Sequence, residues 1–385
     1  MIDDYIDGVI EQLIERSRML VAMIPRDLPR LYDGLSQRCR QELNNILKGL
    51  RFIANDQLLR KPENRFARLR AFRRIVADLD SVESTGIAAL SRAHNDDDRL
   101  NELLARIATE ILYPLPAPSC TTLSRDYFYI NQHLGLMFVP LAEGHFLLHL
   151  PDIYHELAHP LLGVQDDPVI EPYQQQYADA LGMCLEYTRS ELVRLERGRS
   201  PEGTKIALRA WESSWVRGWL AEFFCDLFAA FTVGPAFAWS HLHLVLKRGS
   251  DPYAIPAYVA SSHPADDARM TTVLHALTLS GFSAQALQIR SAWCSCMSAL
   301  GYRAEPEYEL CFPNELLRRI AIRAFDGVKG IGIRFVDLNQ PQSVATKLND
   351  AWAVFWSNPT LFASQEQALL AQVFGTDLLQ AQAPH

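Results

Sequence analysis

Apolar and polar positions follow the period of a helix in the first third of the chain. Apolar side chains recur every three or four residues between positions 6 and 24, until Pro25 interrupts the pattern. The same spacing returns over residues 35–59 and 66–79. Because a helix that buries one face places its apolar side chains at this spacing, the pattern predicts an N-terminal helical domain over residues 1–113.

The pattern changes after a proline-rich segment. Pro114-Leu115-Pro116-Ala117-Pro118 opens a stretch, residues 114–125, that we expect to form a linker. Beyond it, aromatic and β-branched residues cluster at 127–130, 136–139 and 146–148, and this composition predicts short strands.

From about position 152 onward the periodicity is again helical. The predicted fold class is therefore mainly α with a small β-sheet, an α+β arrangement. We expect a second domain over residues 126–280 and a C-terminal helical region over residues 281–385. The sheet could offer an edge strand to an extended peptide, although a plain core hairpin explains the region around 134–148 equally well.

Composition narrows the class of protein. Of the 385 residues 49% are hydrophobic, which is enough for a packed core, and the net charge is −8. This acidity argues against a protein that coats nucleic acid. The basic stretch Arg60–Arg74 keeps a nucleic-acid-associated regulator open, as an alternative to a solvated helix face. The seven cysteines form no CxxC pair, and we recognise neither a secretion signal nor a membrane span, so a cytoplasmic protein is expected.

The segment His155-Glu156-Leu157-Ala158-His159 carries the clearest chemistry. Two histidines at i and i+4 project from one face of a helix, where both imidazoles can bind one Zn²⁺. Zinc lowers the pKa of a bound water toward ~7, and Glu156 is placed to take that proton as a general base.

A catalytic zinc needs a third protein ligand, and the apolar segment around position 222 offers one. Glu222 and Asp226 share a face at i and i+4, and two buried carboxylates there require compensation. Binding to a metal would compensate for the burial of Glu222, and a hydrogen bond to a liganding histidine would compensate for the burial of Asp226. The alternatives are Asp226 as the ligand, or a carboxylate pair satisfied by an arginine. His241 and His243 are weaker rivals, because side chains two residues apart diverge on a helix.

Two further features accompany these carboxylates. Ser262-His263-Pro264 places a histidine in a predicted loop, from which His263 could donate a hydrogen bond to the oxyanion of a tetrahedral intermediate. Trp215 and Trp219 lie on the helical face of Glu222, and an aromatic stripe at this spacing is more typical of a core than of a site wall.

Together the three segments resemble the gluzincin metalloproteases of the CAAX prenyl protease and HtpX family. That family has HExxH, then ExxxD, then HPxxxxR, and here the matches begin at His155, Glu222 and His263, in that order. The resemblance spans about residues 125–275. It implies a zincin-like core with His155, His159 and Glu222 as zinc ligands.

The same resemblance implies roles for the remaining motif residues. Glu156 would be the general base, Asp226 the group that orients a liganding histidine, and His263 the stabiliser of the transition state. Arg269 would hold its segment in place. Two positions depart from the family pattern: Pro160 directly follows the second histidine, and Cys225 stands where the family often has alanine.

The sequence therefore predicts a zinc metalloprotease that hydrolyses peptide bonds through a metal-activated water. A peptide or protein is the expected substrate, and a regulatory protein partner is expected because a cytoplasmic protease must be restrained. The alternative is a non-catalytic, zinc-stabilised interaction protein, in which Glu156 would have no use.

Overall fold

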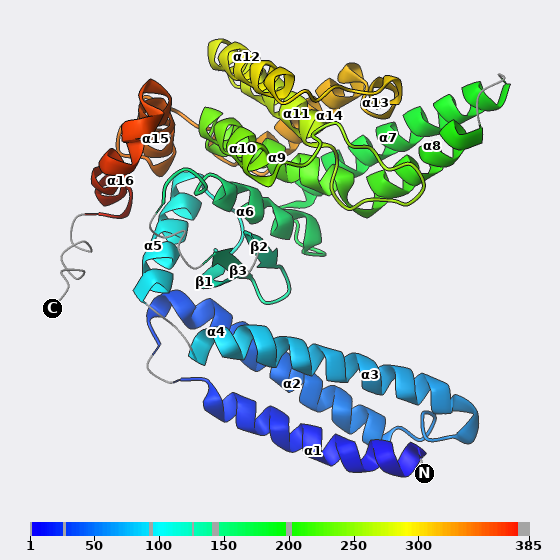
Figure 1. Ribbon diagram of the computed structural model, residues 1–385. Coiled ribbons are helices and arrows are strands. Elements are labelled where there is room, and N and C mark those ends of the chain that lie inside the picture. Colours follow the sequence, from blue (N-terminus) through cyan, green and yellow to red (C-terminus); the bar gives the residue numbers. More distant parts are fainter. Residues whose placement is uncertain are drawn as a thin grey trace. The chain divides into compact units, whose positions relative to one another are not determined.

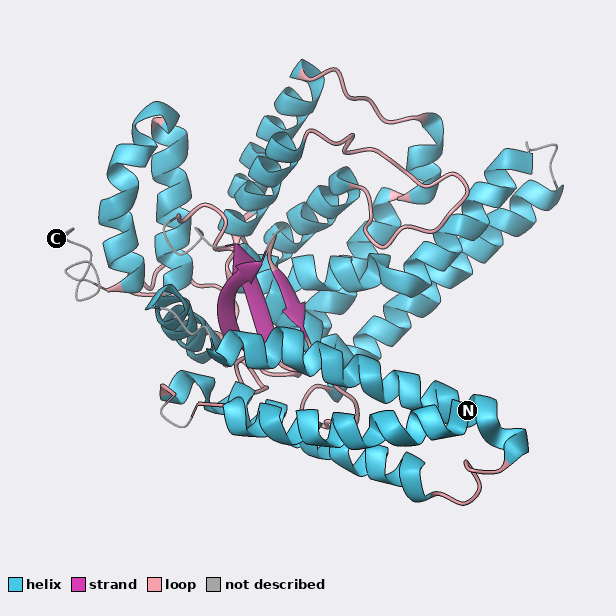
Figure 2. Cartoon of the chain, turned by 60° about the horizontal axis from the view of Figure 1, so that its bottom comes forward, coloured by secondary structure: helices cyan, strands magenta, loops and turns pink. Residues whose placement is uncertain are grey.

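The computed structural model is mainly helical with one small sheet, as predicted (Figures 1 and 2). It describes residues 2–25, 28–91, 95–124, 127–140, 146–197 and 202–375. The chain divides into two compact units. The N-terminal unit comprises Met1–Leu104 and Pro116–Leu141, and the C-terminal unit comprises Ala105–Leu115 and Ala142–His385.

Long helices that pack along one another build the N-terminal unit (Figure 1). The helical elements are α1 (Ile2–Met23), α2 (Asp33–Asn55), α3 (Arg65–Ser81), the π-helical turn η3 (Val82–Ile87), α4 (Ala88–Ser91) and most of α5 (Asn95–Glu110), with short 3₁₀ turns η1 (Arg30–Tyr32) and η2 (Pro62–Asn64). The periodic apolar positions form the core: Leu35, Leu43 and Leu50 of α2 are fully buried.

The basic stretch at 60–74 is exposed in the main, as a solvated helix face requires. Arg68 is the exception, because its side chain is buried and forms an ion pair with Asp7 of α1. Arg60 binds the other oxygen of the same carboxylate at 2.8 Å. Part of the stretch therefore ties α3 and its preceding loop to α1.

Three strands form the sheet: β1 (Ser119–Ser124), β2 (Tyr129–Asn131) and β3 (Leu136–Pro140), in the order β1-β3-β2 (Figure 2). β1 pairs with β3 in parallel and β2 pairs with β3 antiparallel. The strands predicted at 127–130 and 136–139 are confirmed within two residues. The strand predicted at 146–148 is wrong, because those residues are in a bend and turn.

The predicted linker at 114–125 is also wrong in its second half, which is β1. β3 has a neighbour on both sides, so it is the central strand and not the peptide-binding edge considered above. The sheet is joined to the N-terminal helices, where Arg38 of α2 donates hydrogen bonds to the carbonyls of Leu134 and Gly135 at 2.6 and 3.2 Å. The sheet is thus part of the N-terminal unit.

The division into units therefore differs from the domain boundaries expected at 113 and 126. The last turns of α5 and the segment after it belong to the C-terminal unit. Tyr113 donates a hydrogen bond to the carbonyl of Leu157, and Arg334 donates one from its backbone to the carbonyl of Ile111. Long-range contacts of this kind are not visible in the local composition of a proline-rich segment.

The C-terminal unit contains the other helices. They are α6 (Asp152–Gly163), α7 (Glu171–Arg197), α8 (Glu202–Ser214), the π-helical turn η5 (Trp215–Trp219), α9 (Leu220–Thr232), α10 (Pro235–Arg248), α11 (Asp266–Leu279), α12 (Ser283–Ala299), α13 (Pro306–Cys311), α14 (Asn314–Gly330), α15 (Val344–Ser357) and α16 (Pro359–Phe374).

Helix α9 forms the centre of this unit and packs against α6, α7, α11 and α14. All its residues are buried except Ala221 and Glu222, which are partly exposed. Among the helices that the structure describes, none is both long and apolar enough to cross a membrane. The apolar side chains of α9 are instead buried in the core of the C-terminal unit.

Candidate metal centre

The HExxH segment lies in α6, as predicted. His155 and Glu156 are buried and His159 is partly buried, and the two imidazole centroids are 5.1 Å apart. The helix continues through Pro160 to Gly163, where the backbone N–H of Val164 bonds to the carbonyl of Pro160. The proline thus removes one helical N–H without separating the two histidines.

Asp226 of α9 links α6 to α11. Its carboxylate lies 2.8 Å from Nδ1 of His155 and accepts two hydrogen bonds of 2.7 Å from Arg269. Because a carboxylate can only accept, Nδ1 of His155 must be the donor, and this leaves Nε2 as the nitrogen that can bind a metal. The structure therefore joins His155, Asp226 and Arg269, one residue from each of the three segments, and the arginine considered above as a partner of the carboxylates is Arg269. The compact group of possible metal donors is His155, His159 and Cys225, and it does not include the predicted ligand Glu222.

Glu222 lies next to the same histidine. Its Oε2 is 3.6 Å from Nε2 of His155, 3.7 Å from Nη2 of Arg269 and 3.9 Å from Nε2 of His263. Two ligand atoms bound tetrahedrally to one zinc at ordinary bond lengths are roughly 3.3 Å apart. The distance between Glu222 and His155 is close to this value.

The electrostatics of the cluster favour a cation. Burial opposes the charged imidazolium of His155, but the hydrogen bond and charge of Asp226, with the charges of Glu222 and Glu156, outweigh it and raise the pKa to about 9. Burial also disfavours the ionised Asp226, yet Arg269 and His155 hold the pKa of this carboxyl well below its usual range. In addition to the guanidinium of Arg269, a proton on His155 therefore balances the surrounding carboxylates.

The pKa values of the other two residues of the motif shift in opposite directions. Burial raises the pKa of Glu156 to about 7, with Glu222 adding to the rise and His155 opposing it. Burial and the charge of His155 lower the pKa of His159 to about 4, so this imidazole is neutral near pH 7. A neutral imidazole is the form that binds a metal.

His263 lies in the loop before α11, and its side chain is 67% exposed. The loop is tied to α8 and η5: Trp219 donates to Oγ of Ser261 at 2.9 Å, and the Ser261 backbone donates to Oγ of Ser214 at 3.0 Å. Gly218 makes this approach possible, because a Cβ there would lie 2.5 Å from the carbonyl oxygen of Ser262. A π-helical turn, a feature often found near functional sites, therefore positions the histidine.

Cys225 was missed as a candidate ligand, because it was treated only as a replacement for alanine. Its Sγ and donor nitrogens of His155 and His159 all lie within 4.8 Å of one another, a cluster that could hold a metal ion. The signal was present in the spacing, since Glu222 and Cys225 at i and i+3 share a helical face. Burial, with the charges of Glu222 and Glu156, raises the pKa of this thiol well above its usual range.

The weaker candidates lie elsewhere in the C-terminal unit. His241 stacks on Trp293 and contacts the carbonyl oxygen of Asp266 through Nε2 at 3.0 Å. His243 lies beside the ring of His149. Neither belongs to the cluster around His155.

Trp215 and Trp219 are fully buried. Trp215 stacks on Phe223, and both tryptophans contact Phe312. This placement agrees with their interpretation as core residues.

Comparison with known proteins adds no relative. No protein-family model, curated protein or solved structure matches the chain.

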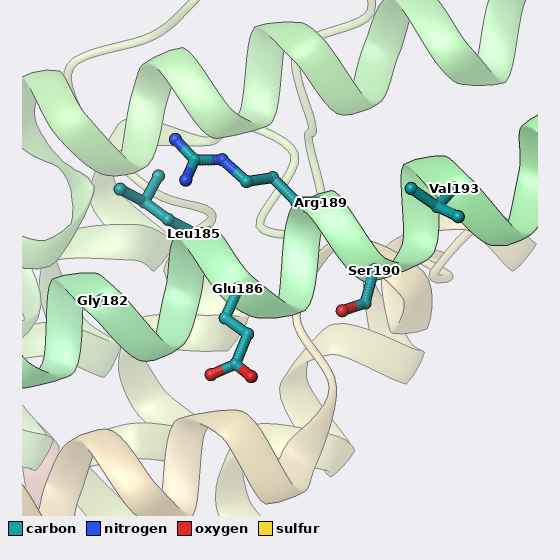
Figure 3. Close-up of a pocket in the computed structure, with 6 residues that line it drawn as sticks. All are labelled: Gly182, Leu185, Glu186, Arg189, Ser190 and Val193. Carbon is teal, nitrogen blue, oxygen red and sulfur yellow. The ribbon is translucent and has the colours of Figure 1, made fainter.

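The open pocket in Figure 3, about 540 Å³ in volume, is lined by α7 and contains none of the predicted site residues. Its Arg189 is paired with Glu212 of α8 at 2.8 Å. The cluster of α6, α9 and α11 therefore remains the candidate site.

Proposed function

We propose that the chain is a zinc-dependent peptidase that hydrolyses peptide bonds. The observation that carries the proposal is the buried link from Arg269 through Asp226 to Nδ1 of His155, with Glu222 beside Nε2. A carboxylate that fixes a histidine in this way is the usual support of a metal-binding imidazole.

The donor set suits zinc. His155 and His159 supply nitrogens and Glu222 supplies an oxygen, which is a ligand combination that catalytic zinc sites use. Three carboxylates (Glu156, Glu222 and Asp226) meet a single guanidinium, so a divalent cation would balance the charge when both imidazoles are neutral. When bound, zinc would polarise the scissile carbonyl and lower the pKa of a water molecule.

Glu156 is the proposed general base. Its raised pKa of about 7 lets the carboxylate accept a proton from the attacking water near neutral pH and then donate it to the leaving amine. His263 is exposed enough for a substrate to reach, and its Nε2 can donate a hydrogen bond to the oxygen on which charge develops. Asp226 and Arg269 act by positioning His155.

Two measurements test this proposal. Purified wild-type protein should contain about one zinc per chain, and His155→Ala should lose it. His241→Ala is the matched control, because His241 is equally buried but lies outside the cluster. A wild-type protein without bound zinc would contradict the proposed site.

Glu156→Gln separates chemistry from binding. The variant should keep its zinc and its fold, while chelator-sensitive cleavage of a peptide library falls by about 10²–10⁴-fold. Glu366→Gln, at another buried carboxylate that accepts the Leu147 N–H, should cleave at the wild-type rate. Full activity in Glu156→Gln would refute the proposed mechanism.

The proposed substrate is a peptide or protein, and a regulatory protein partner is proposed to restrain the activity. We propose a cytoplasmic location, which the free state of all seven cysteines supports. This location can be tested by assaying peptide cleavage in cell fractions. The activity should be found in the soluble cell contents and not in secreted material.

A second candidate function is a non-catalytic, zinc-stabilised interaction protein. Cys225 favours it, because its sulfur clusters with His155 and His159, and cysteine with histidine is a ligand combination typical of structural zinc. In that case zinc removal should unfold the C-terminal unit, and Glu156→Gln should leave the protein's partner binding unchanged. Turnover that depends on Glu156 would exclude this candidate.

A further inference from the structure

The thiol of Cys225 occupies an unusual place for a core cysteine. The side chain is fully buried in α9, one residue before Asp226 and three after Glu222. Its sulfur lies within 4.8 Å of donor nitrogens of both His155 and His159, which belong to another helix. Two helices therefore bring three donors of metal-binding type within reach of one ion.

The same point is adjacent to the proposed third ligand. Oε2 of Glu222 lies 3.6 Å from Nε2 of His155, so the oxygen and the sulfur are both close to the one histidine that Asp226 orients. Zinc accepts either donor, but a softer ion such as Cd²⁺ prefers the sulfur. A site with three protein ligands keeps an open position, whereas a site with four is closed.

We propose that Cys225 is an additional metal ligand, which together with His155 and His159 lets this site bind a thiophilic divalent ion. The inference rests on the proposed function, since it concerns the same metal centre. It adds a sulfur donor to the site, beside the oxygen of Glu222 that lies next to His155.

Cobalt substitution of the full-length protein tests the proposal. Co²⁺ bound by a thiolate shows a sulfur-to-cobalt charge-transfer absorption in the near ultraviolet, whereas Co²⁺ bound by nitrogen and oxygen alone does not. The wild type and the control Cys184→Ser should show this absorption, and Cys225→Ser should lose it. Cys184 is a matched control because it is also fully buried but is outside the cluster. Cys225→Ala replaces the serine variant if that variant does not fold.

Affinity gives an independent measurement. Glu222→Gln should still bind Co²⁺ with the charge-transfer absorption, and adding Cys225→Ser should weaken Co²⁺ binding by on the order of 10-fold or more, since loss of even a supporting group costs that much. Co²⁺ binding without the absorption, at equal affinity in wild type and Cys225→Ser, would overturn this inference and leave the proposed peptidase intact. Failure of the wild type to bind Co²⁺ or zinc at all would overturn both.

Discussion

Replacing Asp226 by asparagine should damage both stability and metal binding. The carboxylate is fully buried and makes three charge-assisted hydrogen bonds, two with Arg269 and one with His155. Arg269 has a side chain only 12% exposed, so the variant leaves a guanidinium largely buried without its charge partner. Removing one member of a buried ion pair costs about 3–5 kcal/mol, which is a large fraction of the stability of a typical domain.

The effect on metal binding follows from the tautomer of the histidine. An asparagine can turn its NH₂ group toward Nδ1 of His155, and this favours the tautomer that carries its proton on Nε2. The nitrogen proposed to bind zinc is then blocked. Loss of a supporting carboxylate typically weakens metal affinity by about 10–100-fold, or roughly 1.4–2.7 kcal/mol.

Urea unfolding of the metal-free protein and calorimetric zinc titration measure the two effects separately. Asp267→Asn is the matched control, because Asp267 is a partly buried carboxylate of α11 that accepts hydrogen bonds from the neutral donors of Trp293 and Tyr308. The control should lose stability without losing zinc affinity. If Asp226→Asn kept zinc affinity within about twofold of the wild type, the proposed role of Asp226 would be refuted.

Two other predictions follow from the site. In the metal-free protein, folded His155 holds its proton up to pH about 9 rather than 6.5, and folded Glu156 up to about 7 rather than 4.5, whereas folded His159 loses its proton at about 4 rather than 6.5. The shifts of Glu156 and His159 oppose one another below pH 6.5, so the folded state binds more protons mainly above that pH. The free energy of unfolding, measured in urea with chelator, should therefore change little from pH 5 to 6 and fall from pH 6.5 to 9; a flat profile between pH 6.5 and 9 would contradict the shifts. In Glu156→Gln the free energy of unfolding should instead rise with pH below 6.5, because the shift of His159 is then unopposed. Gly218→Ala should push the Ser262 carbonyl away and lower kcat/KM for peptide cleavage by about tenfold while zinc content stays constant. Gly182→Ala of α7, where a Cβ meets no atom within 4 Å, should leave cleavage unchanged, and equal rates in both variants would argue against a role for the loop.

Much of the local structure could be read from the residues. The helical period of α2 and the aromatic, β-branched composition of β3 predicted both elements, because burial of one face imposes a spacing on the chain. β1 escaped prediction, since Ser119–Ser124 is rich in serine and threonine and follows a run of prolines. Its strand conformation depends on pairing with β3, a contact that no local pattern encodes.

The same contrast holds within the candidate site. The i, i+4 spacings of His155 with His159 and of Glu222 with Asp226 follow from helix geometry, so each pair could be placed on one face before any tertiary contact was known. The spacing also placed Cys225 on the helical face of Glu222, but a buried cysteine is usually an ordinary apolar core residue, and only the packing of α6 on α9 brings its sulfur near the two histidines. The pKa of Glu156 likewise depends on burial and on neighbours from α9.

The sequence by itself determined which residue types recur at helical spacing, and therefore which side chains each helix could present together. Only the tertiary structure decided that α6, α9 and α11 meet so that Arg269, Asp226 and His155 form one hydrogen-bonded chain. It also decided that the sheet belongs with the N-terminal helices. The physical reason is that helix geometry acts over a few residues, whereas burial of charge and strand pairing depend on contacts between distant parts of the chain.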